Sequence, residues 1–268
     1  MTSHFINRKK ASDHMTNKMA EQDVAAQGYL KSTLYIGLAI FVGYFCLKKH
    51  INRFRLRLFA WVLAKFGCKS NKLFGEHKKK LFHSMKELRA TIGPLNVLEI
   101  GVGGGANFKF YPPQTKVTCL DPNPYFESYT ESNAADTRGV EMTGFIQAYA
   151  EKMDGVRDCS FDVVVSTLVL CSVKDQNRVL EEVKRVLKHN GKFYFLDHVC
   201  APKQSIIYFF QCLMSPLWRV IGDGCELTRD TGSTVKAAGF KLLDMRTFTA
   251  QTKMFLIRPC CMGIATKE

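Results

Sequence analysis

Val97-Leu98-Glu99-Ile100-Gly101-Val102-Gly103-Gly104-Gly105-Ala106-Asn107 is the stretch that decides the fold of this chain. An apolar run ends in a carboxylate and passes directly into a glycine-dense loop. Parallel strands that are buried on both faces read as continuous apolar runs, and glycines let the following backbone turn sharply and approach a ligand closely. The stretch therefore predicts a buried strand that delivers the chain to a nucleotide-sized ligand.

Two binding motifs compete for this loop. Glu99-x-Gly101-x-Gly103-x-Gly105 resembles motif I of the class I S-adenosylmethionine-dependent methyltransferases. Gly101-x-Gly103-x-x-Ala106 also fits the dinucleotide fingerprint in its alanine form. The carboxylate at Glu99 and the early Pro112-Pro113, which leaves only a short helix after the loop, favour the methyltransferase. A glycine-rich loop without a ligand is the third interpretation.

Asp121 is the second candidate binding residue. It lies 20 residues after Gly101, at the carboxyl end of the next predicted strand. A carboxylate in that place can accept hydrogen bonds from both ribose hydroxyls of a bound nucleoside. Asp121-Pro122-Asn123-Pro124 also stops the strand and starts a helix, so a helix cap is the alternative role for Asp121.

The rest of the C-terminal part alternates between strand and helix patterns, which is typical of an α/β fold. A charged helix is expected over residues 75–91, with Lys78-Lys79-Lys80 as a solvated or lipid-facing patch, and a second helix over 175–187 stopping at Asn190-Gly191. We expect a Rossmann-like, seven-stranded, mostly parallel sheet with helices on both faces, its last two strands forming a hairpin. The predicted strands span residues 96–100, 116–120, 144–148, 161–166, 192–196, 239–247 and 255–265.

The positive charge is concentrated near the N-terminus. The chain carries a net charge of +14 over 268 residues, of which +12 falls in residues 1–80 and only +2 in residues 81–268. A basic appendage beside an apolar segment indicates anionic lipid as the partner, and the nearly neutral remainder argues against nucleic acid. The ten cysteines form no C-x-x-C pair, which favours a reducing compartment and gives no support for a metal site.

The N-terminal part predicts a membrane anchor. Residues 1–28 are polar and are expected to form a disordered tail. The uncharged run from Ser32 to Leu47 reaches about 24 Å as a helix, and residues 48–66 mix arginine with aromatic residues in a way that suits a helix in the headgroup layer. We therefore expect an anchor over residues 29–67, a linker at Gly67 to Asn71, and a methyltransferase domain over residues 68–268 that faces the cytosol.

Several further segments resemble one subgroup of the superfamily, the membrane-associated alkyl thiol S-methyltransferases. They are Gly105-Ala106-Asn107-Phe108, Val117-Thr118-Cys119-Leu120-Asp121-Pro122-Asn123-Pro124, Thr167-Leu168-Val169-Leu170-Cys171-Ser172-Val173 and Ile221-Gly222-Asp223-Gly224-Cys225. The resemblance covers residues 68–268, although Val102 and Gly104 depart from the expected Cys and Thr. It implies S-adenosyl-L-methionine as cofactor, methyl transfer to small thiols including hydrogen sulfide, and anchoring at the endoplasmic reticulum or lipid droplets.

The resemblance also implies which residues contact the cofactor. The glycine loop would hold the methionine and ribose parts, and the segment after the third strand would contact the adenine. The cofactor-binding candidates are Glu99, Gly101, Gly103, Gly105, Asn107, Asp121, Pro122, Asn123, Ala150, Glu151 and Thr167.

The candidate catalytic residues are Asp197 and His198, which follow the fifth strand. His198 could take the proton of a thiol, whose ordinary pKa of about 8.5 already allows some thiolate near neutrality; the alternative is a histidine satisfied by backbone groups. Asp223 and Cys225 are candidates for the acceptor pocket or for a structural turn. The apolar residues 206–210, together with Leu213, Met214, Leu217 and Trp218, either cover that pocket or touch lipid.

Two other functions stay open at this point. The anchor would equally suit a methyltransferase that acts on a lipid, a quinone or another lipophilic acceptor. A membrane scaffold without activity would keep the fold but would have no need of Glu99, the glycines and Asp121.

Overall fold

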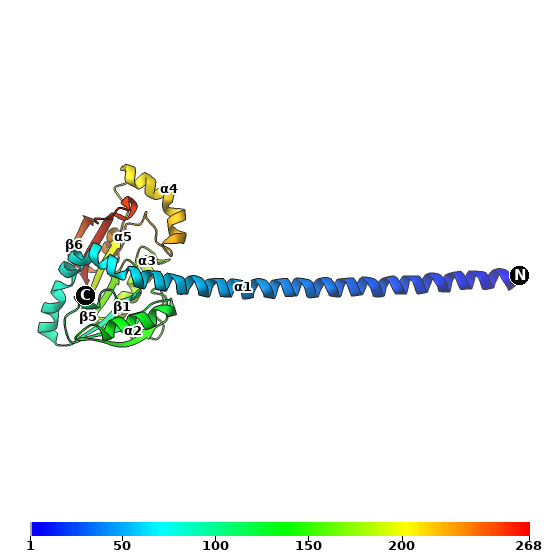
Figure 1. Cartoon of the computed structure of the whole chain (residues 1–268), viewed down its shortest axis with the longest axis horizontal. Helices are drawn as coiled ribbons and strands as arrows, with labels where there is room; N and C mark the ends of the chain where they lie inside the picture. Colours follow the sequence, from blue (N-terminus) through cyan, green and yellow to red (C-terminus); the bar gives the residue numbers. More distant parts are fainter. Residues whose placement is uncertain (1) are drawn as a thin grey trace. The chain divides into compact units, whose positions relative to one another are not determined.

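The computed structural model describes residues 2–268, and it describes the side chains of residues 31, 33–65, 71–241 and 244–268. The chain divides into two compact units, one that ends at Leu56 and one that runs from Arg57 to Glu268. The first unit consists of the N-terminal part of helix α1 (Thr2–Ile92), and the second contains the sheet (Figure 1). The sequence predicted a disordered tail over residues 1–28. The side chains of these residues lie outside the described set, so the disordered tail stays a prediction.

The second unit is built on a seven-stranded sheet with the order β3-β2-β1-β4-β5-β7-β6. β7 runs antiparallel to both β5 and β6, and the other neighbouring strands are parallel. The predicted sheet, including the final hairpin, is therefore confirmed. The strands are β1 (Leu95–Ile100), β2 (Thr115–Leu120), β3 (Val140–Ile146), β4 (Phe161–Thr167), β5 (Leu187–His198), β6 (Lys241–Thr249) and β7 (Pro259–Thr266).

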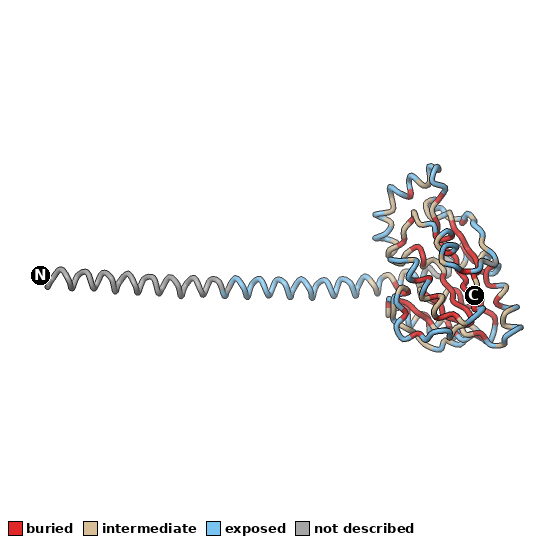
Figure 2. The backbone as a smooth tube through the Cα atoms, turned by 180° about the vertical axis from the view of Figure 1, so that it is seen from behind, coloured by how far each residue is buried: buried red, intermediate tan, exposed pale blue. Residues whose placement is uncertain are grey.

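Helices cover both faces of this sheet, as expected for an α/β fold. The C-terminal part of α1 and helix α2 (Glu127–Ala135) pack on one face, where Phe82 and Met85 meet Val97 and Tyr194. Helix α3 (Gln176–Val186) and helix α5 (Thr231–Ala237) cover the other face. Figure 2 shows the buried residues gathered in the strands between these layers. Helix α4 (Ile206–Ile221) completes the set of longer helices.

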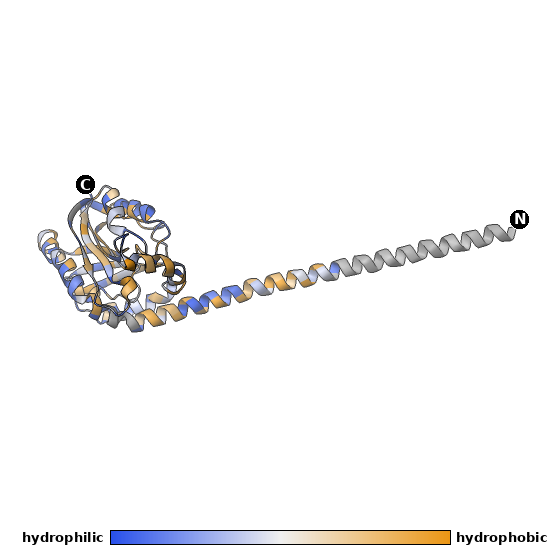
Figure 3. Cartoon of the chain, turned by 90° about the horizontal axis from the view of Figure 1, so that it is seen from above, coloured by the Kyte–Doolittle hydropathy of each residue, from blue (hydrophilic) through white to orange (hydrophobic). Residues whose placement is uncertain are grey.

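Within α1, an apolar stretch precedes a basic stretch. Figure 3 shows the hydrophobic colour over the segment that follows Thr33, and then the hydrophilic colour over the segment from Lys48 to Arg57. Thr33–Lys65 is the one helical segment among the described residues that is long and apolar enough to cross a membrane by length and composition. The side chains from Leu34 to Leu47 are exposed, which is the pattern of a helix without a protein partner.

The end of α1 belongs to the second unit from Arg57 onward. The Arg57 guanidinium lies 5.1 Å from the centre of the Tyr125 ring, and the rings of Phe59 and Phe126 meet edge to face at 6.3 Å. Ala60 is fully buried. The helix continues without a break through residues 67–71, where the sequence predicted a linker. One glycine within a helix costs only about 1 kcal/mol relative to alanine, and packing further along the helix offsets it.

Smaller differences concern the ends of elements. The helix predicted over residues 175–187 is α3, and the Asp175 carboxylate caps it by accepting hydrogen bonds from the N–H groups of Asn177 and Arg178 at 3.0 and 3.2 Å. α3 ends at Val186, before the predicted stop, because Leu187 is already extended. β3 begins at Val140, four residues before the predicted third strand. Residues 255–257 form a short 3-10 helix, η3 (Phe255–Ile257), ahead of β7.

Candidate functional site

The carboxyl ends of β1 and β4 lie side by side, and they mark the point where the strand order reverses. Ligands of open α/β sheets bind at this switch point. Glu99 is the penultimate residue of β1, and its carboxylate accepts hydrogen bonds from Asn107 Nδ2 at 2.8 Å and from the Tyr111 hydroxyl at 2.6 Å. Asn107 Nδ2 also donates to Thr167 Oγ1, at the end of β4, at 2.9 Å. The structure thus brings together Glu99, Asn107 and Thr167, three of the predicted cofactor residues, and adds Tyr111.

Lys78 is a further residue of this site, and sequence reasoning missed it. The prediction that Lys78 belongs to a solvated patch is wrong, because its side chain is only 2% exposed. Burial lowers the pKa of Lys78 to about 8, while the charge of Glu99 acts against that decrease. Burial likewise raises the pKa of Glu99 to about 7, although the hydrogen bonds from Tyr111 and Asn107 counteract it. Lys78 Nζ donates to Asn71 Oδ1 at 3.3 Å, so α1 contributes a charged group to the site.

Asp121 follows β2 and is buried beside the glycine loop. Its carboxylate accepts hydrogen bonds from the N–H groups of Gly103 at 3.1 Å and of Asn123 at 2.9 Å. Burial raises the pKa of Asp121 to about 6, against the effect of these two hydrogen bonds, and the nearby charge of Asp223 adds to the increase. These contacts fix the carboxylate against the backbone of the loop. Asn123 accepts from the Tyr125 N–H, and Pro122 is exposed.

The glycine loop itself requires glycine at three positions. Gly101, Gly103 and Gly105 have φ angles of 62°, 53° and 74°, which side chains with a Cβ rarely adopt. The loop after β4 lies directly over the first of them, because a Cβ built on Gly101 would lie 2.4 Å from Cγ2 of Val169. Leu168 has a positive φ of 61°, a strained conformation of the kind that gathers at functional sites. The Val169 side chain therefore packs directly against the glycine loop at Gly101.

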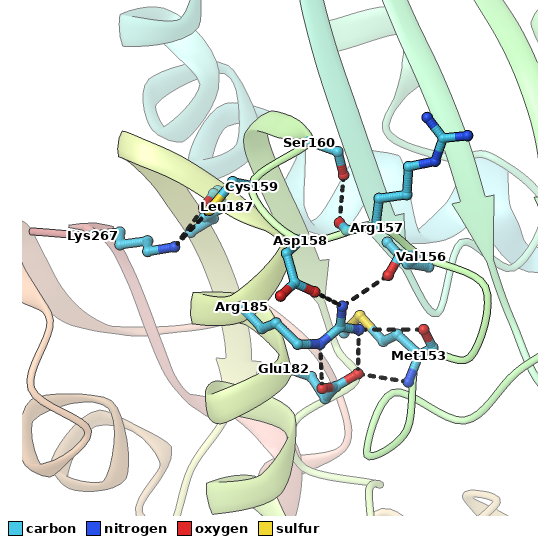
Figure 4. A network of polar contacts seen from close by, with 10 residues as sticks. All are labelled: Met153, Val156, Arg157, Asp158, Cys159, Ser160, Glu182, Arg185, Leu187 and Lys267. Carbon is cyan, nitrogen blue, oxygen red and sulfur yellow. Dashed lines mark hydrogen bonds and ion pairs between the residues drawn. The ribbon is translucent and has the colours of Figure 1, made fainter.

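The segment that follows β3, which holds the predicted adenine contacts, is tied to helix α3 (Figure 4). The Met153 N–H donates to Glu182 Oε2 at 2.8 Å, and the Arg185 guanidinium donates to the carbonyls of Met153 at 3.3 Å and Val156 at 2.8 Å. Arg185 also binds Asp158 at 2.6 Å. The pKa of Arg185 is raised, mainly by its hydrogen bond to Glu182.

The two predicted contacts in that segment, Ala150 and Glu151, lie in the turn ahead of Met153. Ala150 is buried, and Glu151 Oε1 accepts a hydrogen bond from the Lys174 N–H at 2.6 Å. Ala150 packs into the core under α3, and Glu151 connects this turn to the loop after β4.

Asp197 and His198 do not form an acid–base pair. They are successive residues of β5, so their side chains leave the strand on opposite faces. Asp197 is fully buried; its Oδ1 accepts from the Cys171 N–H at 3.1 Å, while its Oδ2 has no hydrogen bond of ordinary geometry. Burial raises the pKa of Asp197 to about 8. His198 lies against Phe74 on the other face, and burial lowers its pKa to about 4.

Cys225, a predicted acceptor-pocket residue, lies beside Cys171. A hydrogen bond from the Cys171 thiol lowers the pKa of Cys225 to about 7, and the Trp218 indole contributes to the decrease. The charge of Asp197 adds to the raised pKa of Cys171, and the charge of Cys225 adds to the raised pKa of Asp197. Asp223, the other predicted pocket residue, is near enough to Asp121 to raise its pKa. The acceptor candidates and the donor candidates therefore meet at one end of the sheet.

Buried polar atoms without a partner also gather at this end. Among the described residues they include Asn107 Oδ1, Ser166 Oγ near the end of β4 and Asp197 Oδ2. Buried polar groups are nearly always hydrogen-bonded, so such atoms need an explanation. Their number here fits a site that binds a polar ligand. No group of three or more metal-ligating side chains lies among the described residues.

Comparison with known proteins places the chain among methyltransferases. Residues 98–195 match the family described as Methyltransferase domain. The chain is similar to human thiol S-methyltransferase TMT1A, with 43% identity over 209 residues that cover 78% of this chain and 86% of that protein. It is also similar to rat thiol S-methyltransferase TMT1B, with 42% identity and the same coverage.

Solved structures with the same fold are more distant. The N-methyltransferase NodS from Bradyrhizobium japonicum has a TM-score of 0.51 and 14% identity, covering 72% of this chain and 96% of that chain. The YcgJ protein from Bacillus subtilis has a TM-score of 0.52 and 17% identity, covering 69% of this chain and 98% of that chain. At these identities the likeness supports the fold alone.

Proposed function

Because the chain belongs to the family of thiol S-methyltransferases, we propose that it methylates the sulfur of small lipophilic thiols, with hydrogen sulfide as a further candidate, at a membrane surface. The observation that carries this proposal is the 43% identity to a thiol S-methyltransferase over 78% of the chain. The methyl donor is S-adenosylmethionine. When bound, it supplies an electrophilic methyl group on a positively charged sulfur.

The residues at the switch point fit this donor. Asp121 is held by two backbone N–H groups and keeps acceptor capacity for the ribose hydroxyls, and Asn107 Oδ1 is a buried acceptor without a partner. The Glu99 carboxylate adds negative charge where the donor carries an ammonium group. Gly101, Gly103 and Gly105 give the loop the positive φ angles that shape it, Gly103 has no side-chain atom closer than 4.0 Å to the place a Cβ would take, and the turn at Ala150 and Glu151 would border the adenine.

We assign the general base to Asp197 instead of His198. A base works best when its pKa is near the operating pH, and the Asp197 carboxyl, with a pKa of about 8, is well matched to a thiol. With a pKa of about 4, His198 is neutral but a weak base, and it lies on the opposite face of β5. In the proposed step the thiol proton passes to Asp197, the sulfur forms a bond to the methyl carbon, and the carbon–sulfonium bond breaks in line.

The proposed location is a membrane of the endoplasmic reticulum or a lipid droplet, with the catalytic unit on the cytosolic side. Support comes from the apolar segment of α1 and from the basic residues that follow it, because Lys and Arg are retained on the cytoplasmic side of a membrane segment. The partner of this segment would be membrane lipid.

The test of the proposed function uses the full chain in lipid vesicles with methyl-labelled donor. An alkanethiol, the matching alkanol, a phenol and a quinone are offered as acceptors. We expect label on the thiol and none on the alcohol, whose proton is held too tightly for a weak base. The Asp121→Asn variant controls for transfer that does not use the site. Labelling of the quinone or phenol, with none on any thiol, would overturn the acceptor class.

A further inference from the structure

Helix α4 turns its apolar side away from the protein. Ile206, Leu213 and Val220 are 73%, 63% and 78% exposed, and Phe209 and Leu217 are exposed as well. These residues recur at the three- and four-residue spacing that defines one face of a helix. In a surface helix of an ordinary domain that face points to the core. In α4 it points outward, and Figure 2 shows most of the helix as exposed.

The orientation of α4 is fixed by contacts on its inner side. Gln211 is fully buried, accepts a hydrogen bond from the Ala201 N–H at 2.8 Å and donates one to the Leu256 carbonyl at 2.8 Å. The Phe210 and Phe255 rings meet edge to face at 6.0 Å, which joins α4 to η3. The helix is therefore held to the domain by a buried polar side chain, and rotation of the apolar face inward would break these hydrogen bonds.

The exposed apolar surface extends onto η3, and the two segments that form it carry basic residues. Met254 and Phe255 are exposed beside α4. Residues 200–222 and 250–258 contain four basic residues and no acidic residue, and all four are exposed: Lys203, Arg219, Lys253 and Arg258. One of them, Arg219, forms an ion pair with Glu226, with 3.5 Å between Nη1 and Oε1. Exposed apolar side chains together with exposed basic residues are the composition of a helix that lies in the headgroup layer of a membrane.

We propose that α4 and η3 form a lipid-binding surface of the catalytic unit, separate from α1, which inserts its apolar face into an anionic bilayer. The 16 residues of α4 are too short to span a membrane of about 30 Å, so the helix lies parallel to the surface. The four basic residues favour lipid over a second copy of this chain, since two such surfaces would bring like charges together. Phospholipid headgroups with negative charge are the complementary partner.

This surface has a consequence for the acceptor, which rests on the proposed function. Trp218 lies on the inner side of α4 and borders Cys225. The width of helix α4 therefore separates the lipid-facing surface from the acceptor candidates. A lipophilic thiol dissolved in the bilayer would then reach the site past α4 without crossing water.

Tryptophan fluorescence in vesicles tests the insertion directly and needs no activity. Leu213→Trp places a reporter on the proposed surface, and Lys236→Trp places a matched reporter on exposed α5; both variants keep Trp61 and Trp218 as a common background. The full chain is incorporated into vesicles of phosphatidylcholine and phosphatidylserine that contain brominated lipid. We expect the added emission of the Leu213→Trp variant to be quenched and that of the Lys236→Trp variant to be unaffected. Equal, unquenched emission from both reporters would overturn the proposal.

A second variant tests the link to the acceptor. The triple change Phe209→Gln, Leu213→Gln and Leu217→Gln alters exposed side chains only, so the fold should persist. In vesicles we expect the rate with a long-chain alkanethiol at limiting concentration to fall roughly tenfold, in line with the dependence of interfacial binding on buried apolar area. The rate with water-soluble 2-mercaptoethanol should not change.

The remaining outcomes are equally decisive. An equal loss with both thiols would show that α4 acts on the site by itself, and it would overturn the route through lipid. Conversion of a dimer into a monomer by the triple change would assign the surface to a second copy and overturn the lipid proposal. Absence of turnover with any thiol, combined with quenching at position 213, would reject the thiol function and leave the lipid surface standing.

Discussion

At the scale of single residues, the buried carboxylates decide how the site responds to substitution and to pH. Asp121→Ala should remove charge-assisted hydrogen bonds to the donor, each worth about 1.5–3 kcal/mol, and weaken donor binding at least about tenfold. Because the pKa of Asp121 is about 6 and its ionised form is the better acceptor, affinity of the wild type should also fall as the pH drops below 6. Calorimetric titration at two pH values measures both effects, and unchanged affinity would reject the assignment of Asp121.

Asp197 should show opposite effects on activity and stability. Asp197→Asn keeps the acceptor for the Cys171 N–H but removes the base, so we expect the rate to fall by about 10²–10⁴. A carboxyl whose pKa is raised to about 8 in the folded protein binds its proton more tightly there than in the unfolded chain. Its stabilising contribution is complete below pH 4 and is lost as the pH rises through 8. The amide variant should therefore melt at a higher temperature than the wild type at pH 8.5 and equally near pH 3.5.

His198→Gln provides the contrasting variant for the assignment of the base. With a pKa near 4, His198 stays neutral from pH 6 to 9, so its replacement should leave the shape of the pH–rate profile unchanged. Thiolate formation and Asp197 would then account for the rise of the rate with pH. Selective loss of rate at pH 6–7 in this variant would restore His198 as the base.

Residues at strand ends could be predicted from sequence, and residues from elsewhere could not. Glu99, Asp121 and Thr167 each lie at or next to the carboxyl end of a predicted strand, so their positions at one edge of the sheet follow from the strand pattern. Lys78 stands in a run of three lysines, and nothing in that run distinguishes the buried residue from its exposed neighbours. Val169 packs against Gly101 because Leu168 adopts a positive φ. A positive φ at a leucine cannot be predicted from an apolar sequence.

At the scale of elements, helix α3 holds the segment that follows β3. Arg185→Lys cannot reproduce the simultaneous contacts with Met153, Val156 and Asp158, because a lysine has one donor group where arginine has a planar fork. We expect KM for the donor to rise several-fold while kcat changes little, and amide exchange at residues 150–156 to accelerate. Arg178→Lys, on the exposed side of the same helix, is the matched control. A fall in kcat with unchanged KM would contradict the positioning role.

Helix α1 belongs to two parts of the protein, and a truncation series can separate them. Ala60 is buried and Phe59 contacts Phe126, so removal of residues 1–67 should destabilise the catalytic unit, whereas removal of residues 1–56 should leave a folded unit that binds the donor. Thermal melting and donor titration of the two truncated chains measure the difference. Equal behaviour of both would place the boundary at the predicted linker.

The continuous helix was missed because the sequence signal at residues 67–71 is purely local. Gly67 and the polar residues after it read as a break, while the reasons for continuity lie in the packing of Ala60 before them and of Phe74, Phe82 and Met85 after them. The sheet was easier to predict, since the buried strands carry their own apolar patterns and parallel strands need long crossover connections between them.

At the scale of the whole molecule, the basic part of α1 predicts the orientation of the catalytic unit. Protease added outside sealed microsomes should digest residues 57–268 without detergent, because the proposed orientation puts Lys48, Lys49 and the arginines at 53, 55 and 57 on the cytosolic side. Blotting for a C-terminal tag measures the loss, and a lumenal protein serves as the control. Protection of the tag until detergent is added would reverse the orientation.

The insertion of β7 between β5 and β6 also constrains how the protein is made. During synthesis β6 leaves the ribosome before β7, yet it has no partner in the sheet until β7 arrives, and β5 keeps an open edge for the same interval. Unpaired edges are templates for association with other chains. A message that stops before Pro259 would therefore yield a chain with its donor residues intact and an exposed β5 edge, and we expect such a chain to depend on chaperones and to be degraded.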